Sequence, residues 1–196
     1  VLAGRSPERF AGAEVGGARV EVVAFDGDDT DGHEAALDAA WAAAGGTVDT
    51  VVVAFGALGE QFPGAEDPDA AVALLRTNAL GAGSAVLRAA RRLQRQGSGA
   101  LVLLSSVAAE RPRPSNYVYA AGKTAADFLA RGVADATGVR VLVVRPGFVP
   151  TRMTAAMKAP PLSATPDQVA AATVDALRRG RSVVYVPRSM RLLALV

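Results

Sequence analysis

A serine, a tyrosine and a lysine are the side chains of this sequence whose types and spacing best fit chemistry. Tyr119 and Lys123 stand four residues apart, so on a helix they share one face about one turn apart. An ammonium near a phenol favours the phenolate, so we expect Lys123 to lower the pKa of Tyr119 and make it a general acid/base. Ser106 can donate a hydrogen bond to an oxygen that becomes negative during reaction. Together the three side chains predict proton transfer to or from a substrate oxygen.

The tyrosine and lysine could instead be solvated side chains on an exposed helix, because a Tyr-x-x-x-Lys pair often arises by chance. Two observations favour chemistry. Ser106 lies thirteen residues before Tyr119, after an apolar run over residues 100–104 that is typical of a buried strand. Lysine is also rare, since Lys123 and Lys158 stand against 19 arginines. A lysine at this spacing is therefore informative.

Length and composition indicate one globular domain over residues 1–196. The sequence has no cysteine, which excludes a disulfide framework and a thiolate metal site. We find no apolar run of about 18 residues that would predict a membrane span, and no signal peptide pattern. A net charge of +2 is too small to indicate nucleic-acid binding. These features predict a protein that acts on a small molecule, in the cytoplasm or on a membrane face.

Apolar runs alternate with helical patterns along the chain. The predicted strands cover residues 1–4, 20–25, 50–54, 100–104, 139–144 and 182–186, and the predicted helices cover 34–44, 67–96, a segment carrying Tyr119 and Lys123, and 166–179. The strands are unbroken apolar runs, as expected where helices cover both faces of a sheet. The pattern therefore predicts an α/β fold with a doubly wound parallel sheet.

Polar residues and glycines follow the predicted strands. In a parallel sheet of this kind, ligands bind outside the carboxyl ends of the strands. The residues at those ends are Gly4-Arg5, Asp26, Ala54-Phe55-Gly56, Ser106 and Pro146-Gly147. The sequence therefore predicts a ligand site along one edge of the sheet.

With these residues in place, the chain resembles the short-chain dehydrogenase/reductase family over nearly all of its length. Ser106, Tyr119 and Lys123 fall at the family's serine, tyrosine and lysine positions, and Asn78 falls at the fourth catalytic position, in the helix before the serine strand. The resemblance implies a Rossmann-like fold and hydride transfer between a nicotinamide and a ketone or alcohol. It also implies that Lys123 holds the nicotinamide ribose and that Asn78 supports a water.

The resemblance also implies which residues bind the cofactor: Gly4, Arg5, Asp26, Ala54, Phe55, Gly56, Tyr119, Lys123, Pro146, Gly147, Val149 and Thr151. Phe55 departs from the family's Asn-Ala-Gly turn, and Asp26 matches the acidic residue beside the adenine. An acidic residue at the end of the first strand would accept a hydrogen bond from the ribose 2′-hydroxyl of NAD, but this sequence has Gly4 at that position. Arg5 next to it suits the 2′-phosphate of NADP. We therefore expect NADP(H), with NAD(H) as the alternative.

One departure from the family is large. Members open with a strand and a glycine-rich turn that cradles the pyrophosphate, whereas this sequence begins at what resembles the second strand. Gly81-Ala82-Gly83 is no substitute, because it lies within a helical pattern. The span from Arg5 to Val20 is also short for a complete helix. We expect a preceding segment of about forty residues outside this sequence, rather than a truncated gene.

Within the family, the chain most resembles reductases of a lipid-linked keto-sugar, decaprenylphosphoryl-2-keto-ribose, which lead to the arabinosyl donor of cell-wall arabinan. The turn Ala54-Phe55-Gly56 and the loop Glu110-Arg111 are the most specific matches. This resemblance implies reduction to the arabino configuration, a partner oxidase of the same epimerisation, and a homo-oligomer. The alternatives are a reductase of another ketone, 3-oxoacyl or alcohol substrate, and a catalytically silent member that senses nucleotides or acts as a scaffold.

Several other features have simpler explanations. Arginines cluster at residues 88–95, which a solvated face explains at least as well as lipid contact, and at 178–191, where an apolar tail favours contact with a membrane. The acidic turn over residues 26–31 lacks the spacing of a metal cage, and we expect it to be a solvated turn. We expect His33, which follows it, to begin the next helix. Trp41 and Phe128 have the spacing of core residues.

Overall fold

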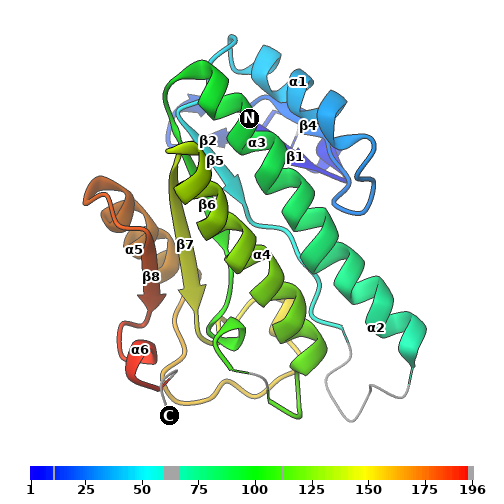
Figure 1. The fold of residues 1–196 in the computed structure, drawn as a ribbon, viewed down its shortest axis with the longest axis vertical. Coiled ribbons are helices and arrows are strands. Elements are labelled where there is room, and N and C mark those ends of the chain that lie inside the picture. Colours follow the sequence, from blue (N-terminus) through cyan, green and yellow to red (C-terminus); the bar gives the residue numbers. More distant parts are fainter. Residues whose placement is uncertain (11, 60–66, 112, 194–196) are drawn as a thin grey trace.

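The computed structural model describes residues 1–10, 12–59, 67–111 and 113–193. It has a Rossmann-like α/β fold, in which strands and helices alternate as predicted (Figure 1). The elements are β1 (Leu2–Gly4), the 3-10 helix η1 (Pro7–Phe10), β2 (Glu14–Val15), β3 (Ala18–Arg19), β4 (Val22–Ala24), α1 (His33–Ala43), β5 (Thr50–Val53), α2 (Pro68–Leu75), the π-helix η2 (Arg76–Gly81), α3 (Ala82–Gln96), β6 (Ala100–Leu104), the 3-10 helix η3 (Val107–Ala109), α4 (Tyr117–Thr137), β7 (Arg140–Pro146), the 3-10 helix η4 (Arg152–Thr154), α5 (Pro166–Arg178), β8 (Val183–Val186) and α6 (Met190–Leu193).

The parallel strands form two sheets rather than one. Strands β5, β6, β7 and β8 pair in that order, and β1 pairs separately with β4. Every pair within these two sheets is parallel. The predicted parallel topology is therefore confirmed, whereas the single continuous edge of strand ends is divided between a four-stranded and a two-stranded sheet.

A small hairpin, which lies between β1 and β4 in the sequence, was not predicted. Strands β2 and β3 are antiparallel, and Gly16 and Gly17 connect them with φ values of 58° and 78°. Two consecutive residues with positive φ are the requirement of a tight hairpin turn, which glycine meets without steric cost. The short span after Arg5 thus holds one turn of 3-10 helix and a hairpin in place of a full helix.

Helices cover both faces of the four-stranded sheet. Along β6, Leu101 and Leu103 join a cluster with Val86 of α3 and Ala130 of α4. Val102, between them, belongs to a second cluster with residues of α5. Alternate side chains of a strand point to opposite faces, so an unbroken apolar run is what this strand requires.

The predicted helix over residues 67–96 is present as α2, η2 and α3, which follow one another without a break. Within the described residues, Pro68–Gln96 is the one helix long and apolar enough to cross a membrane by length and composition. Its side chains at Val86 and Ala89 are fully buried in the cluster against the sheet and α4. One face of this helix is therefore buried against the sheet and α4, although only 33% of its most apolar window is buried.

Phe128 lies outside the core, contrary to its spacing, whereas His33 begins a helix as predicted. Phe128, on α4, is 70% exposed. His33 begins α1 but is fully buried, stacked on Phe25, with Nε2 2.9 Å from the Asp26 carbonyl oxygen and Nδ1 3.0 Å from Ser84 Oγ. Trp41 is partly buried against the core, as predicted.

Part of the first arginine cluster is structural rather than solvated. Arg88 Nη1 lies 2.9 Å from Glu34 of α1, and Arg92 contacts Glu34 at 2.8 Å and Asp38 at 2.6 Å. Arg92 is only 6% exposed. These ion pairs tie α3 to α1.

The close approach of Gly81 to the turn after β4 gives a test of this packing. A Cβ at Gly81 would overlap the Gly27 carbonyl oxygen, so Gly81→Ala forces backbone to move and should cost about 1–3 kcal/mol of unfolding free energy. In Gly132→Ala on α4, the new Cβ meets nothing within 4 Å, and removing a helical glycine should stabilise by about 0.5–1 kcal/mol. Thermal unfolding of both variants checks this; an unchanged midpoint for Gly81→Ala would contradict the packing.

Candidate active site

The structure brings Ser106, Tyr119 and Lys123 together. Ser106 follows β6 and caps η3, with its Oγ accepting from the Ala108 backbone N–H at 3.1 Å. Tyr119 lies in the first turn of α4 and shares a side-chain hydrogen bond with Ser106. The Lys123 Nζ lies 6.0 Å from the centre of the Tyr119 ring. A hydroxyl, a phenol and an ammonium therefore converge at the carboxyl end of β6.

Lys123 is fixed to the end of the serine strand. The side chain is buried, and its Nζ donates to the carbonyl oxygen of Leu104, the last residue of β6, at 3.0 Å. Burial lowers the pKa of Lys123 to about 8, because a charged ammonium loses its hydration there. The cation therefore sits close to its titration point at neutral pH.

The predicted direction of the Tyr119 pKa was wrong. Burial raises the pKa of Tyr119 above its ordinary value, and the Ser106 hydrogen bond, which lowers it, only partly offsets this effect. The Lys123 ammonium is bonded to the Leu104 carbonyl rather than to the phenol oxygen. Tyr119 is therefore protonated at neutral pH and holds a proton that it can give to a substrate oxygen.

Asn78 completes the group from the π-helix η2. Its side chain is 1% exposed and bonds both backbone groups of Ala57, accepting from N at 2.9 Å and donating to O at 2.7 Å. A Cβ on Gly56 would lie 3.0 Å from Asn78 Oδ1 and 3.1 Å from Lys123 Nζ. The predicted turn after β5 therefore lies against both side chains. The π-helix itself was not predicted; such segments are frequent at functional sites.

The turns after β5 and β7 lie at the same edge of the sheet as Ser106. Ala54 is exposed and Pro146, which ends β7, is buried. Gly147 donates its N–H to the Val186 carbonyl oxygen at 2.8 Å. Val149 packs against the core cluster of α5, and Thr151 is exposed at the start of η4. Of these residues, Ala54 and Thr151 are exposed, whereas Gly147 and Val149 are partly buried.

The two-stranded sheet brings the other predicted cofactor residues together. Gly4 pairs with Ala24, and the Phe25 N–H donates to the Gly4 carbonyl oxygen at 3.0 Å. Arg5 and Asp26 therefore follow neighbouring strand ends, and both are exposed. The Phe25 and Phe55 rings, 5.5 Å apart, connect this sheet to the end of β5.

The departure at Phe55 has a packing reason. Its ring is partly buried against the core, and a Cβ at Gly27 would lie 2.6 Å from the ring. The phenylalanine therefore fills space beside the turn after β4, where the family's asparagine would leave a gap.

These residues fit the two ends of a dinucleotide. Lys123 offers donors beside Gly56, where the missing side chain leaves room, and Arg5 offers a guanidinium beside Asp26. Within the described residues, no strand is followed by a glycine-rich turn that opens a helix, so no pyrophosphate cradle is present there. The described part of the chain also holds no group of three or more His, Cys, Asp or Glu placed to bind a metal. Instead, Asp28 accepts from Thr77 and Asp29 from the Gly32 N–H, which shapes the acidic turn.

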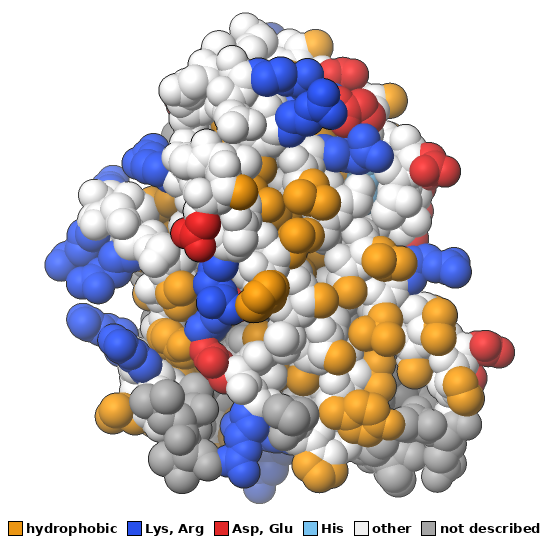
Figure 2. Space-filling view, viewed as in Figure 1, with side chains coloured by type: hydrophobic (Ala, Val, Ile, Leu, Met, Phe, Trp, Pro, Cys, Tyr) orange, Lys and Arg blue, Asp and Glu red, His pale blue; other side chains and the backbone are white. Residues whose placement is uncertain are grey.

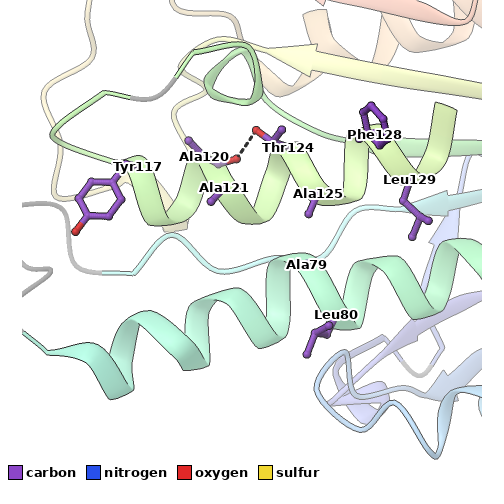
Figure 3. Close-up of a pocket in the computed structure, with 9 residues that line it drawn as sticks. All are labelled: Ala79, Leu80, Tyr117, Ala120, Ala121, Thr124, Ala125, Phe128 and Leu129. Carbon is purple, nitrogen blue, oxygen red and sulfur yellow. Dashed lines mark hydrogen bonds between the residues drawn. The ribbon is translucent and has the colours of Figure 1, made fainter. Parts of the chain in front are cut away.

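Two hollows lie near α4. One, of about 530 Å³, opens beside Tyr119 and is bounded by residues 57–59 and Thr77. Its size suits a small-molecule ligand. The other, of about 750 Å³, is an apolar groove between α4 and η2 lined by Leu80, Phe128 and Leu129, among others (Figure 3). Of the four catalytic candidates, Tyr119 lines the first hollow and none lines the groove. The first hollow is therefore the one that opens on the catalytic group.

A buried ion pair behind the site was not predicted from the sequence. Asp127 is 2% exposed and Arg145 is 8% exposed, and they form a charged pair between α4 and β7. Asp127 stands four residues after Lys123, and Arg145 directly precedes Pro146. These positions could have predicted the pair, because both residues fall in segments expected to be buried. Charged residues are almost never buried without a partner of opposite charge.

Comparison with known proteins agrees with this geometry. The model of the short chain dehydrogenase family matches residues 1–161. An uncharacterized oxidoreductase of Mycobacterium tuberculosis is 42% identical over 199 residues, covering 97% of this chain and 80% of the relative.

Solved structures share the fold. A short-chain dehydrogenase from Burkholderia cenocepacia, in complex with NADP, has a TM-score of 0.83 at 24% identity, covering 98% of this chain and 78% of that one. A short-chain dehydrogenase/reductase from Mycobacterium ulcerans has a TM-score of 0.82 at 27% identity, covering 96% and 79%. With its fold, its Ser-Tyr-Lys-Asn group and these matches, the chain belongs to the short-chain dehydrogenase/reductase family of NAD(P)-dependent oxidoreductases.

Proposed function

We propose that this protein uses NADPH to reduce a ketone to an alcohol. The observation that carries the proposal is the convergence of Ser106, Tyr119, Lys123 and Asn78 at the carboxyl end of β6. When bound, the nicotinamide supplies the hydride for the ketone carbon. The protein's own side chains then handle the proton and the charge on the oxygen.

Each side chain has a distinct part. Tyr119, protonated at neutral pH, gives its proton to the ketone oxygen, and Ser106 donates a hydrogen bond to the same oxygen as charge develops. Lys123 places a positive charge beside the phenol and offers donors to the nicotinamide ribose. Asn78 fixes the turn at Ala57 and supports a water on the proton path.

NADP(H) is the proposed cofactor because of the end of β1. Gly4 offers no carboxylate that would repel a 2′-phosphate, and the exposed Arg5 guanidinium can donate to it. Asp26, at the neighbouring strand end, lies where the adenine would be recognised. NAD(H) remains the alternative cofactor.

For the substrate, we propose decaprenylphosphoryl-2-keto-ribose, reduced to the arabinose form for cell-wall arabinan. The turn Ala54-Phe55-Gly56 and the Glu110-Arg111 loop support this, as does the segment after β7. There Met153 and Met157 are exposed and lie close in sequence to Arg152 and Lys158, a composition that suits an apolar tail and a phosphate. A partner oxidase would supply the keto-sugar at a membrane face. A different ketone, a 3-oxoacyl group or an alcohol is the competing substrate.

We also propose a homo-oligomer, assembled through the apolar groove between α4 and η2. Leu80 and Phe128 are 65% and 70% exposed there, and Figure 2 shows apolar side chains gathered over this face. Exposed apolar patches of this kind mark interaction sites, and a second copy would cover the groove on both chains.

Removing the tyrosine hydroxyl tests the reaction. Tyr119→Phe should lower kcat about 10²- to 10⁴-fold, because it removes the acid, while NADPH binding stays largely intact. NADPH oxidation by the full-length protein, with the lipid-linked keto-sugar against a panel of short ketones, measures turnover and substrate choice. Tyr117→Phe, in the groove on the same helix, is the matched control. Normal turnover by Tyr119→Phe would contradict the mechanism.

Neutralising Arg5 tests the cofactor. Arg5→Ala should raise the KM for NADPH about tenfold to a hundredfold, the loss of a charge-assisted hydrogen bond, and leave the KM for NADH unchanged. Arg9→Ala, an exposed arginine in η1, is the control. An equal change for both cofactors would show that Arg5 does not contact the 2′-phosphate.

A further inference from the structure

Behind the active site, a cluster of polar side chains joins five segments of the chain. Its members are Ser105 at the end of β6, Glu110 after η3, Asp127 and Arg131 on α4, Arg145 on β7 and Tyr185 on β8. Ser105, Asp127 and Arg145 at its centre are buried, whereas Glu110 and Arg131 at its edges are exposed. The mechanism above uses none of them. Three of the segments also carry residues of the active site, so the cluster spans the parts that must stay in register.

Asp127 and Arg145 form the centre of the cluster. The Asp127 carboxylate accepts from Arg145 Nε at 2.8 Å and from Arg145 Nη2 at 2.7 Å, a two-pronged contact. It also accepts from Ser105 Oγ at 2.9 Å and from Arg131 Nε at 3.0 Å. These four bonds use the acceptor positions of the carboxylate. Burial alone would raise the pKa of Asp127, but the Arg145 hydrogen bonds and charge, with Ser105 and Arg131, hold it below its ordinary value.

The far side of Arg145 reaches the next loop and strand. Its Nη1 donates to Glu110 and, at 2.7 Å, to the Tyr185 hydroxyl, which itself donates to Glu110. The guanidinium also lies 5.5 Å from the centre of the Tyr185 ring. Two carboxylates and two arginines balance the charge of the cluster. A planar guanidinium is required, because a lysine ammonium cannot make the two-pronged contact and reach the loop at once.

Three members of the cluster lie next to active-site residues in sequence, or one helical turn away. Ser105 precedes Ser106, Arg145 precedes Pro146, and Asp127 lies one helical turn after Lys123. We propose that Asp127 and Arg145 are positioning residues, which hold the Ser106 strand end and the Pro146-Gly147 turn in register with Tyr119 and Lys123. This inference rests on the proposed function for its kinetic consequences, but its geometric content does not depend on the substrate.

If the cluster only stabilised the fold, its substitution would change stability and not the geometry of the active site. A buried ion pair can often be replaced by apolar residues of similar size without loss of stability, whereas removing one partner leaves an unpaired buried charge. The double variant Asp127→Leu/Arg145→Met should therefore stay folded while it loses the hydrogen bonds that set the register. The double variant therefore separates the effect of the pair on active-site geometry from its effect on the stability of the fold.

The experiment compares the double variant with Arg145→Lys and with Ser105→Ala, which removes only one donor. Readouts are the thermal midpoint, kcat, and the Tyr119 pKa from NMR titration of ring-labelled tyrosine in the cofactor-free protein. We expect the double variant to keep its thermal midpoint within a few degrees and to lose at least about tenfold in kcat. The Tyr119 pKa should rise in each variant, since a displaced Ser106 no longer lowers it. Arg179→Lys, which changes an exposed Asp175–Arg179 pair of 2.8 Å on α5, is the control and should change nothing.

The outcomes separate the two proposals. A double variant with wild-type kcat and an unmoved Tyr119 pKa would overturn the positioning role, as would Ser105→Ala with both quantities unchanged if the double variant does not fold. Failure of the wild-type protein to reduce any ketone would overturn the proposed function instead. The Tyr119 titration would then still decide whether the cluster sets the geometry.

Discussion

The burial of one ammonium is the constraint on which this structure depends. Lys123 is 7% exposed, and a charge so poorly hydrated is unstable unless polar groups replace the lost water. The fold supplies the Leu104 carbonyl oxygen at 3.0 Å and keeps side chains away at Gly56. These features place the cation beside Tyr119, where the ribose of the proposed cofactor would bind. The proposed chemistry follows from this placement, because a protonated phenol, a nearby cation and a hydroxyl are what reduction of a ketone requires.

The elements around Lys123 pack closely against one another. Gly122 on α4 brings the helix so close to η2 that a Cβ there would lie 2.7 Å from the Cβ of Asn78. Asn78 in turn holds the backbone of Ala57 by two hydrogen bonds. Helix α4 thus contacts the serine strand through Lys123 and β7 through Asp127. It also packs through Gly122 against Asn78 of η2, which holds the turn after β5. A single helix positions most of the catalytic group.

Sequence patterns with a simple physical basis predicted most of this architecture. Unbroken apolar runs identified the strands of the parallel sheet. Residue spacing and the family resemblance predicted a group of Ser106, Tyr119, Lys123 and Asn78, and the fold brings these four residues close together. The predictions that were wrong concern properties that depend on a residue's three-dimensional surroundings. The pKa of Tyr119 is set by burial, which spacing does not report, and Phe128 has a core-like spacing but faces outward. The π-helix and the Asp127–Arg145 pair arise from contacts between segments distant in sequence. The division of the sheet, likewise, is a matter of which strands pair.

The most direct test of the account is the titration of Lys123 itself. With lysine labelled at Cε and Lys158 replaced by arginine, the protein has a single lysine signal that NMR can follow against pH. The account predicts a midpoint of about 8, as expected for a buried ammonium at the catalytic centre. A midpoint near the ordinary lysine value of about 10.4 would show a solvated side chain and contradict the site described above.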